Sequence, residues 1–385
     1  MPDDRNHTDV RDAVARLCAD FPGQYWRDKD RQKQYPVEFV EALTEGGYLS
    51  VLIPEEYGGA GMDIAAACAI LEEIQRSGAN SGACHAQMYT MGTLLRHGSD
   101  AQKRQYLPDI AGGKLRLQAF GVTEPSSGTD TTRIKTKAVR DGDDYIVSGQ
   151  KVFISRVEHS DLMLLLVRTT ARDEVEKPTQ GMSVLLVDLR EAIGNGLTVR
   201  PLETMINHAT TELFFDALRV PTENLIGEEG KGFGYILDSM NAERILIAAE
   251  CIGDARWFID KASAYAKQRE VFGRPIGKNQ AVQFPIARAY VQTEAAAHMV
   301  VSACELFDAA QACGSEANMA KLLASEASWA AADMCLQTHG GYGFATEYDV
   351  ERKFRETRLY QVAPISTNLI LSNIATHILG LPKSF

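Results

Sequence analysis

Hydrophobic residues recur every three to four positions over most of the first third of the chain. Residues 37–49, 63–78 and 78–98 show this spacing, which is typical of amphipathic helices. From about residue 118 the pattern changes to short runs of Val, Leu, Ile and Phe separated by Gly, Asp, Asn and Pro. Such runs predict antiparallel strands. After residues 227–234 the helical period returns and continues almost to the last residue.

The order of helices, strands and helices predicts an α+β protein that is mainly α. We place an N-terminal α-helical domain at residues 1–117, a middle β domain at 118–228 and a C-terminal helical domain at 229–385. No repeat of 20 to 50 residues is visible, which argues against a solenoid or a propeller.

Glu243 lies within the helical period of the segment "SMNAERILIAAE" (239–250). It falls three residues after Met240, seven after Ile236 and four before Ile247, so it joins an apolar row of the helix. A carboxylate removed from water must be paired, hydrogen-bonded or held protonated. Two interpretations therefore stand, a structural ion pair with an arginine and a general base.

Composition narrows the class of protein. The 385 residues are 45% hydrophobic and 24% charged, and the formal net charge of −11 argues against a nucleic-acid partner. The N-terminus lacks the features of a secretory signal, and no apolar run approaches the roughly 20 residues that span a bilayer. We therefore expect a cytoplasmic protein that binds no membrane. The seven cysteines are scattered without metal-ligand spacing, so we expect reduced thiols and no metal.

Three glycine-rich stretches raise the question of a nucleotide site. "GGAG" (58–61), "GKGFG" (230–234) and "HGGYG" (339–343) all lack the G-x-G-x-x-G turn that follows a strand in dinucleotide-binding folds. Taken singly, each favours a turn or a helix cap over a phosphate cradle.

Five motifs nevertheless occur in one order along nearly the whole chain. They are "PEEYGGAG" (54–61), "QAFGVTEPSSGTD" (118–130), "KVFIS" (151–155), "REVFGRPIGKNQ" (269–280) and "QTHGGYGFATEY" (337–348). Together, with their spacings, they resemble the acyl-CoA dehydrogenase flavoprotein family. The resemblance implies N-terminal helices, a middle antiparallel β domain and a C-terminal four-helix bundle, as the periodicity does. It also implies FAD between the β domain and the C-terminal helices, in a homotetramer made of two dimers.

The resemblance assigns cofactor contacts within the middle domain. Thr123 matches the residue on the pyrimidine side of the flavin, and Ser155 matches the hydroxyl residue near N5. Phe153 replaces the tryptophan often found against the ring, and an apolar flat face is kept. Gly128 and Thr129 match positions where backbone and hydroxyl donors approach the pyrophosphate, and such closeness requires a glycine.

Other residues, by the same resemblance, contact the FAD of the neighbouring subunit. Arginine suits a pyrophosphate by its charge and its forked geometry. Without the surrounding motif, Arg269 would be interpreted as a surface residue and Phe272 as a core residue. Oligomerisation is thereby implied to be part of cofactor binding. The residues in question are Arg269, Phe272, Gln280, Gln337, Gly340 and Gly341.

The family's reaction removes a proton next to a thioester carbonyl while a hydride leaves the next carbon for flavin N5. Many members carry the base as the glutamate of a "Y-x-x-x-E-G-T-S" stretch, but this chain has Pro364 there and no Asp or Glu after Glu356. Relatives acting on isovaleryl-CoA or long chains carry the glutamate on the first long C-terminal helix, where Glu243 stands. The resemblance thus implies that Glu243 is the base and that Arg244 supports the substrate pocket.

Pro364 raises a second question. In the family a backbone N–H at this position polarises the thioester oxygen, and losing such a donor can cost roughly 3 kcal/mol. Proline has no N–H. Either a neighbouring donor such as Ile365 N–H replaces it, or the reaction differs. Ser366 and Asn368 still match the hydroxyl and amide positions that approach the cofactor.

The sequence does not define the length or branching of the substrate's acyl group. His85, Met88 and Tyr89 match a helix that forms one wall of the acyl pocket, although ordinary core packing explains such residues equally well. The leading hypothesis is an FAD-dependent acyl-CoA dehydrogenase that passes electrons to electron-transfer flavoprotein. The alternatives are an acyl-CoA reductase, a desulfinase, a flavin oxidase or monooxygenase, and a non-catalytic flavoprotein.

Overall fold

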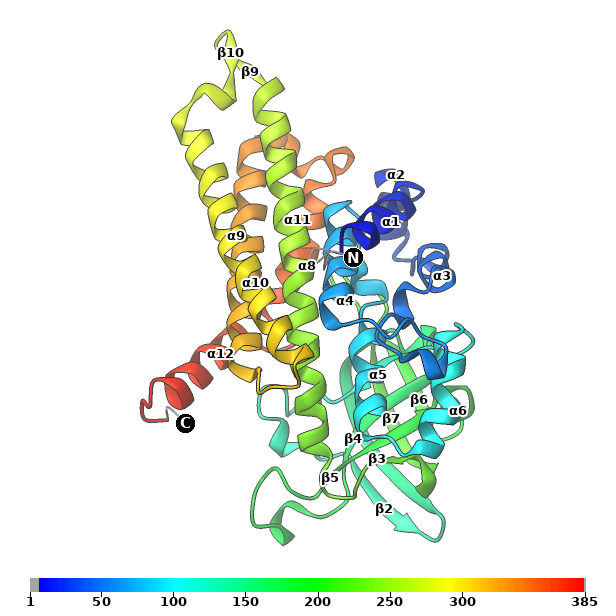
Figure 1. The fold of residues 1–385 in the computed structure, drawn as a ribbon. Coiled ribbons are helices and arrows are strands. Elements are labelled where there is room, and N and C mark those ends of the chain that lie inside the picture. The colour runs from blue at the N-terminus through cyan, green and yellow to red at the C-terminus, as the bar shows by residue number, and fades with distance from the viewer. Residues whose placement is uncertain (1–6, 384–385) are drawn as a thin grey trace. The chain divides into compact units, whose positions relative to one another are not determined.

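The computed structural model describes residues 7–383, whose chain divides into two compact units. The first unit comprises residues 1–34, 63–81 and 241–385, and the second comprises residues 35–62 and 82–240. Along the chain, N-terminal helices precede a β-sheet and C-terminal helices follow it (Figure 1). The predicted α+β class, mainly α, is confirmed.

The helices and strands have the following bounds. The helices before the sheet are α1 (Thr8–Ala19), α2 (Gly23–Gln32), α3 (Val37–Glu45), α4 (Ile64–Arg76), α5 (Ala86–His97) and α6 (Asp100–Ala111). The sheet region holds β1 (Leu117–Gly121), β2 (Lys137–Asp141), β3 (Asp144–Ser155), β4 (Leu162–Arg168), β5 (Met182–Asp188), α7 (Leu189–Ala192), β6 (Leu197–Pro201), β7 (Thr210–Pro221) and β8 (Leu225–Ile226). The C-terminal elements are α8 (Gly232–Gln268), β9 (Glu270–Val271), β10 (Arg274–Pro275), α9 (Gln280–Asp308), α10 (Gly314–His339), α11 (Val350–Arg358) and α12 (Thr367–Asn373).

The sheet of the second unit has the strand order β6-β7-β3-β2-β4-β5-β8, with β1 beside β4. Most neighbours are antiparallel, as predicted, while β1 and β2 each pair with β4 in parallel. Every residue of β4 is buried, because Leu164 and its alternate neighbours face one hydrophobic cluster while Leu165 and its alternate neighbours face another. Burial on both faces explains the uninterrupted run "LMLLLVR".

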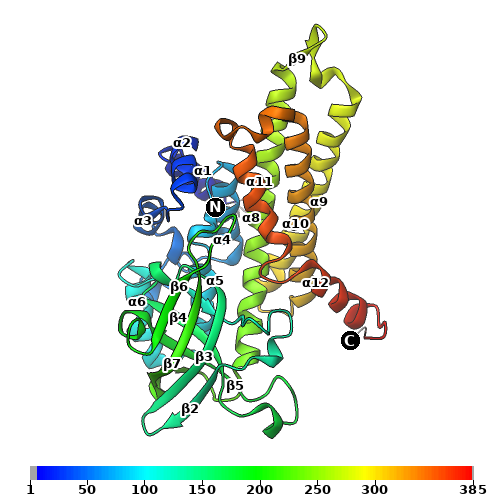
Figure 2. The same ribbon diagram turned by 180° about the vertical axis from the view of Figure 1, so that it is seen from behind.

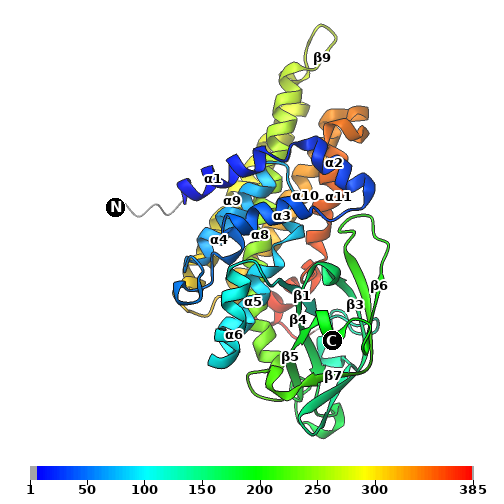
Figure 3. The same ribbon diagram turned by 90° about the vertical axis from the view of Figure 1, so that its right-hand side faces the viewer.

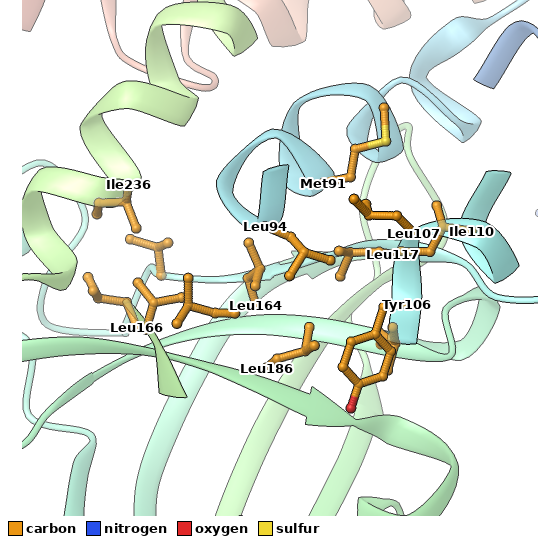
Figure 4. Packing of buried hydrophobic residues seen from close by; sticks show 14 of the residues in the cluster. Met91, Leu94, Tyr106, Leu107, Ile110, Leu117, Leu164, Leu166, Leu186 and Ile236 are labelled. Atoms are coloured by element: carbon orange, nitrogen blue, oxygen red, sulfur yellow. The ribbon is translucent and has the colours of Figure 1, made fainter. Parts of the chain in front are cut away.

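Helices α5 and α6 cover one face of this sheet. Met91 and Leu94 of α5 and Leu107 of α6 pack with Leu164 and Leu186 of the strands (Figure 4). On the other face, side chains of β4 and β5 share a cluster with those of β3, β6 and β7. The strands therefore enclose a second hydrophobic core on this face, which is made mostly of their own side chains.

The helices of the first unit pack through small residues. Alanines of α8, α9 and α10 lie in one buried cluster, and these helices run side by side in both views of the ribbon (Figure 2). Gly253 permits a close approach of α8 to α4, because a Cβ there would meet the carbonyl oxygen of Glu72. A glycine inside a helix destabilises it by roughly 0.5–1 kcal/mol relative to alanine. The close packing of α8 against α4 explains why a glycine occurs here.

Two peripheral elements complete this unit. The hairpin of β9 and β10 extends past the ends of the helices that it joins, α8 and α9 (Figure 3). Helix α12 carries exposed apolar side chains, among them Leu371, and further ones follow at Ile378 and Leu379. Among the described residues, all seven cysteines are buried as free thiols. Over residues 7–383, no helix combines the length and the hydrophobicity needed to cross a bilayer.

Candidate functional site

A β-bulge in β3 brings three of the predicted cofactor residues together in the second unit. Lys151 pairs with Leu213 and Ile154 with Thr211, so β3 has one residue more than β7 between these pairs. The extra length turns Phe153 outward, at φ 59° and 62% exposed. The N–H of Val152, next to it, donates to the carbonyl of Thr123 at 3.0 Å. The backbone of Thr123 thus lies beside the end of β3 that carries Phe153 and Ser155.

A buried ion pair holds the loop that follows Thr123. Lys151 Nζ lies 3.0 Å from Glu124 Oε1 and also donates to the carbonyl of Val122 at 2.9 Å. The Glu124 carboxylate accepts from the N–H groups of Lys135 and Thr136 at 2.6 and 2.9 Å. Burial lowers the pKa of Lys151 to about 8. Burial disfavours the charged form of Glu124, but Lys151 and the N–H donors outweigh it and lower its pKa.

Gly128 and Thr129 lie exposed on this loop. A Cβ added to Gly128 would meet no atom of the chain within 4 Å, and the backbone there is not left-handed. The packing of the chain itself therefore does not require a glycine at this position. A ligand that approaches the backbone would supply the missing reason.

The hydroxyl of Ser155 belongs to a small polar cluster that the sequence did not indicate. Asn207 Nδ2 donates to Ser155 Oγ at 2.7 Å, and Thr210 Oγ1 lies 3.3 Å from the same oxygen. Asn207 stands in the loop between β6 and β7, 52 residues away along the chain. No local pattern could have found it, because the contact arises from the pairing of β3 with β7.

Tyr89, His85 and Met88 are all buried at α5 in the second unit. The rings of Tyr89 and His85 lie 5.7 Å apart and tilted by 54°. Burial is what ordinary core packing predicts for them, and it is equally compatible with the predicted acyl-pocket wall.

In the first unit, Glu243 and Arg244 are buried on α8, each with 8% of its surface exposed. Arg244 donates to the amide oxygens of Asn318 on α10 and of Asn241, the latter at 2.5 Å. Asn318 Nδ2 in turn donates to Asn373 Oδ1 of α12 at 3.1 Å. Burial lowers the pKa of the Arg244 guanidinium. A chain of polar side chains thus links the helix of Glu243 to the C-terminal segment.

The segment around Pro364 is held from the same face of α10. Lys321, one turn after Asn318, donates from Nζ to the carbonyl of Ile365 at 2.7 Å. Burial lowers the pKa of Lys321 to about 8. Ser366 caps α12, where its hydroxyl accepts from the N–H of Leu369. Lys321 was not predicted from the sequence, because its partner carbonyl lies 44 residues further along the chain and no local pattern records that contact.

Two more buried acids follow Glu243 along the same face of α8. Glu250 and Asp254 come seven and eleven residues later, which places all three in one row of the helix. Asp254 Oδ1 lies 2.5 Å from Lys353 Nζ of α11, and both side chains are fully buried. Burial raises the pKa of Asp254 to about 6. Burial, together with Glu250 and Asp254, raises the pKa of Tyr360 well above its usual value.

Four of the residues predicted to contact a partner's FAD line one cavity of about 620 Å³ in the first unit. Gly340 and Gly341 leave open space where a Cβ would stand. The Arg269 guanidinium lies 5.8 Å from the ring centre of Tyr342, and within residues 7–383 no acidic side chain lies within ion-pair distance of it. The four residues are Arg269, Gln337, Gly340 and Gly341.

Phe272 and Gln280 do not line this cavity. Phe272 stands at the tip of the hairpin between β9 and β10, fully exposed and at φ 53°. A bulky side chain in the left-handed region is strained, and here it also leaves an aromatic ring in water. Gln280 is the exposed first residue of α9. Ser366 and Asn368 do not line this cavity either.

Comparisons with known proteins cover nearly the whole chain. Family models match residues 4–114 (acyl-CoA dehydrogenase, N-terminal domain), 119–218 (middle domain) and 230–379 (C-terminal domain). The chain is 34% identical over 379 residues to acyl-CoA dehydrogenase FadE12 of Mycobacterium tuberculosis, covering 98% of this chain and 96% of the relative.

Two further similarities bear on the chemistry. The chain is 33% identical over 332 residues, 86% of each protein, to subunit CarC of the caffeyl-CoA reductase-Etf complex of Acetobacterium woodii. The structure of a glutaryl-coenzyme A dehydrogenase in complex with glutaryl-CoA superimposes with a TM-score of 0.91 at 30% identity, covering 100% of this chain and 97% of that one. The relatives therefore include both dehydrogenases and a reductase.

Proposed function

Since the chain belongs to the acyl-CoA dehydrogenase family of oxidoreductases, we propose that it binds FAD and oxidises an acyl-CoA thioester to the 2-enoyl-CoA. The observation that carries the proposal is the buried position of Glu243. It is buried on α8, and no Asp or Glu follows Glu356 to take the base's role from the C-terminal segment. The family resemblance had implied the same residue.

Several features fit FAD. Gly128 and Gly341 leave their backbones open to close approach, although their own packing does not demand a glycine. Gly340 also leaves open space, but its φ of 58° lies in the left-handed region and favours glycine by itself. The Arg269 guanidinium borders a cavity with no acidic partner among the described residues, which suits a pyrophosphate. The exposed ring of Phe153 offers an apolar face to a flavin. These groups fit one FAD shared between subunits, as the resemblance implies.

In this proposal the residues of the chain supply binding and proton transfer. Bound FAD supplies hydride acceptance at N5. The Glu243 carboxylate takes the proton from the carbon next to the thioester carbonyl. Asn318 and Lys321 hold Arg244 and the backbone at Ile365 in place, so that the Ile365 N–H can replace the donor that Pro364 lacks.

The proposed partners follow from the same reasoning. Electron-transfer flavoprotein is the proposed electron acceptor, and the similar protein CarC belongs to a caffeyl-CoA reductase-Etf complex. A homotetramer is the proposed assembly, because the cavity around Arg269 would serve a neighbour's FAD. The exposed, strained Phe272 supports an intersubunit contact at the hairpin tip.

A reductase is the second candidate function. One observation favours it, the similarity to a caffeyl-CoA reductase subunit. The missing N–H at Pro364 does not separate the two candidates, because both directions of the reaction pass through the same transition state. The same base and flavin can serve either direction, so the preferred substrate decides between them.

Anaerobic flavin spectroscopy tests the proposal and separates the two candidates. The purified protein should carry FAD, and saturated acyl-CoAs of differing length and branching should bleach its absorbance while 2-enoyl-CoAs should not. If only enoyl-CoAs react, by reoxidising a chemically reduced flavin, the protein is a reductase. If no acyl-CoA or enoyl-CoA changes the spectrum, both candidates fail.

A further inference from the structure

The cluster around Ser155 contains more hydrogen-bonding groups than the proposed function uses. Ser155 pairs with Thr210 in the last rung between β3 and β7, and Thr210 is buried. Asn207 stands three residues before Thr210, at the end of the β6–β7 loop. Its φ of 54° lies in the left-handed region, which asparagine tolerates better than most residues.

The loop that carries Asn207 is tied to the sheet on both sides of the cluster. The N–H of Arg156 donates to the carbonyl of Ala209 at 2.6 Å, and the Thr211 hydroxyl donates to the carbonyl of Ile154 at 2.8 Å. The N–H of Leu202 donates to the carbonyl of Thr210 at 2.8 Å. These bonds fix the positions of Asn207 and Thr210 relative to Ser155.

The direction of each hydrogen bond follows from the donors available. The Asn207 amide nitrogen only donates, so at 2.7 Å it occupies one acceptor site of Ser155 Oγ. The single proton of the Thr210 hydroxyl goes to the carbonyl of Asn207 at 2.6 Å. At the 3.3 Å contact, Thr210 Oγ1 therefore offers a lone pair to Ser155.

The Ser155 proton is left with two positions. It can point to Thr210 Oγ1, in which case the remaining lone pair of Ser155 faces outward, or it can itself point outward. In the first position Ser155 accepts a hydrogen bond from a ligand, and in the second it donates one. Asn207 closes the third direction, because its N–H groups repel the Ser155 proton.

A flavin needs both positions. Its N5 accepts a hydrogen bond when oxidised and carries a proton, hence donates, when reduced. We propose that Asn207 and Thr210 are positioning residues that let the Ser155 hydroxyl donate to oxidised N5 and accept from reduced N5–H. This inference rests on the proposed binding of FAD with N5 near Ser155. Thr210 supplies the alternative acceptor, so it stabilises the reduced flavin selectively.

The midpoint potential of bound FAD, titrated anaerobically against a reference dye, tests the inference. Thr210→Val removes the alternative acceptor and leaves the Ser155 proton outward, so the equilibrium should shift toward oxidised flavin by about tenfold, the effect of one hydrogen bond. Thr210→Ser keeps a hydroxyl and should retain the wild-type potential. Thr169→Val is the matched control, because the Thr169 hydroxyl in the same unit lies 2.8 Å from the Ser183 hydroxyl and contacts none of the three residues of the cluster.

A double-mutant cycle shows whether the effect passes through Ser155. In a Ser155→Ala background, Thr210→Val and Asn207→Ala should no longer change the potential, whereas each should change it when Ser155 is present. Equal potentials for Thr210→Val, Thr210→Ser and wild type, all with stoichiometric FAD, would overturn the inference alone. The same holds if Thr169→Val shifts the potential as much as Thr210→Val. A wild-type protein that cannot bind FAD overturns the proposed function as well.

Discussion

Glu243 combines two properties that a single residue rarely has without a reason. It is an acid in an apolar helical row, and it is buried next to an arginine whose guanidinium donates to two asparagine amides. Burying a carboxylate is expensive unless other groups compensate. The proposed role as a base would explain why this cost is accepted, and no acid after Glu356 offers an alternative base in the C-terminal segment.

Glu243→Gln tests the base assignment, because glutamine keeps the shape of the side chain but cannot take up a proton from the substrate. We expect FAD to stay bound while the rate of flavin reduction by the best acyl-CoA falls by about 10²–10⁴-fold. Stopped-flow measurement of the bleaching of the flavin absorbance gives the rate.

Glu250→Gln is the matched control for that experiment. Glu250 is buried in the same row of α8, two turns further along, so it reports on perturbation of the helix without touching the proposed base. Its variant should reduce flavin at nearly the wild-type rate. Near-normal reduction by the Glu243 variant would exclude Glu243 as the base, and equal losses in both variants would make the role structural.

At the scale of elements, buried ion pairs fix the segments that carry the site. Lys151 of β3 and Glu124 attach the loop that holds Thr123 and Gly128. Lys353 attaches α11 to Asp254 of α8 and also donates to Gln75 of α4 at 2.7 Å. Because both partners are buried, breaking such a pair leaves an uncompensated charge, and the element that depends on it loses its anchor.

The Glu124–Lys151 pair predicts a specific pH dependence of stability. Because the folded-state pKa of Glu124 is lowered below its usual 4.5, its contribution is present above that value and is lost as the pH falls through the folded-state pKa. Glu124→Gln should therefore cost about 3–5 kcal/mol of unfolding free energy at pH 7, and the difference from wild type should shrink below about pH 4.5. Urea unfolding at several pH values measures both quantities.

An exposed carboxylate provides the comparison. Asp141 lies 3.3 Å from Arg219 with most of both side chains exposed, so Asp141→Asn should change the unfolding free energy by less than about 1 kcal/mol. If the Glu124 variant is no less stable than the Asp141 variant at pH 7, or if its deficit persists unchanged in acid, the buried pair does not anchor the loop.

At the scale of the whole molecule, the chain carries exposed apolar side chains and a cavity that contribute nothing to the packing of its own core. Phe272 is fully exposed, the cavity at Arg269 has no acid among the described residues to pair with that arginine, and α12 carries exposed apolar side chains. Exposed aromatic and apolar groups of this kind are typical of contacts between subunits. An assembly that shares FAD between subunits would use all three.

Arg269→Ala tests the shared cofactor. Losing a charged hydrogen bond to a pyrophosphate costs about 1.5–3 kcal/mol, so FAD should bind roughly 10- to 100-fold more weakly, and the oligomer should dissociate more readily. The FAD content after gel filtration and the mass by light scattering measure the two effects, while flavin reduction in the FAD that remains should be little changed.

Arg274→Ala is its control, since Arg274 lies in the same hairpin but donates to Asn279 at 2.8 Å and does not line the cavity. It should keep both FAD and assembly. Full retention of FAD and of the oligomer by the Arg269 variant would remove Arg269 from the cofactor site.

Local sequence patterns were enough to predict the order of helices and strands, the family, and the row of α8 in which Glu243 lies. Periodicity records which face of a local segment is buried, and motifs record short stretches of backbone, so both can be read without a fold. The strand run of β4, buried on both faces, was recognisable for the same reason.

Which buried polar groups contact one another could not be predicted before the fold was known. Asn207 reaches Ser155, Lys321 reaches the carbonyl of Ile365, and Lys353 reaches Asp254, across 52, 44 and 99 residues of chain. The partner of a buried polar group depends on where distant segments pack, and no local preference encodes that. Backbone strain could not be predicted either. The left-handed backbone of Phe153 results from a bulge that exists only when β3 pairs with β7.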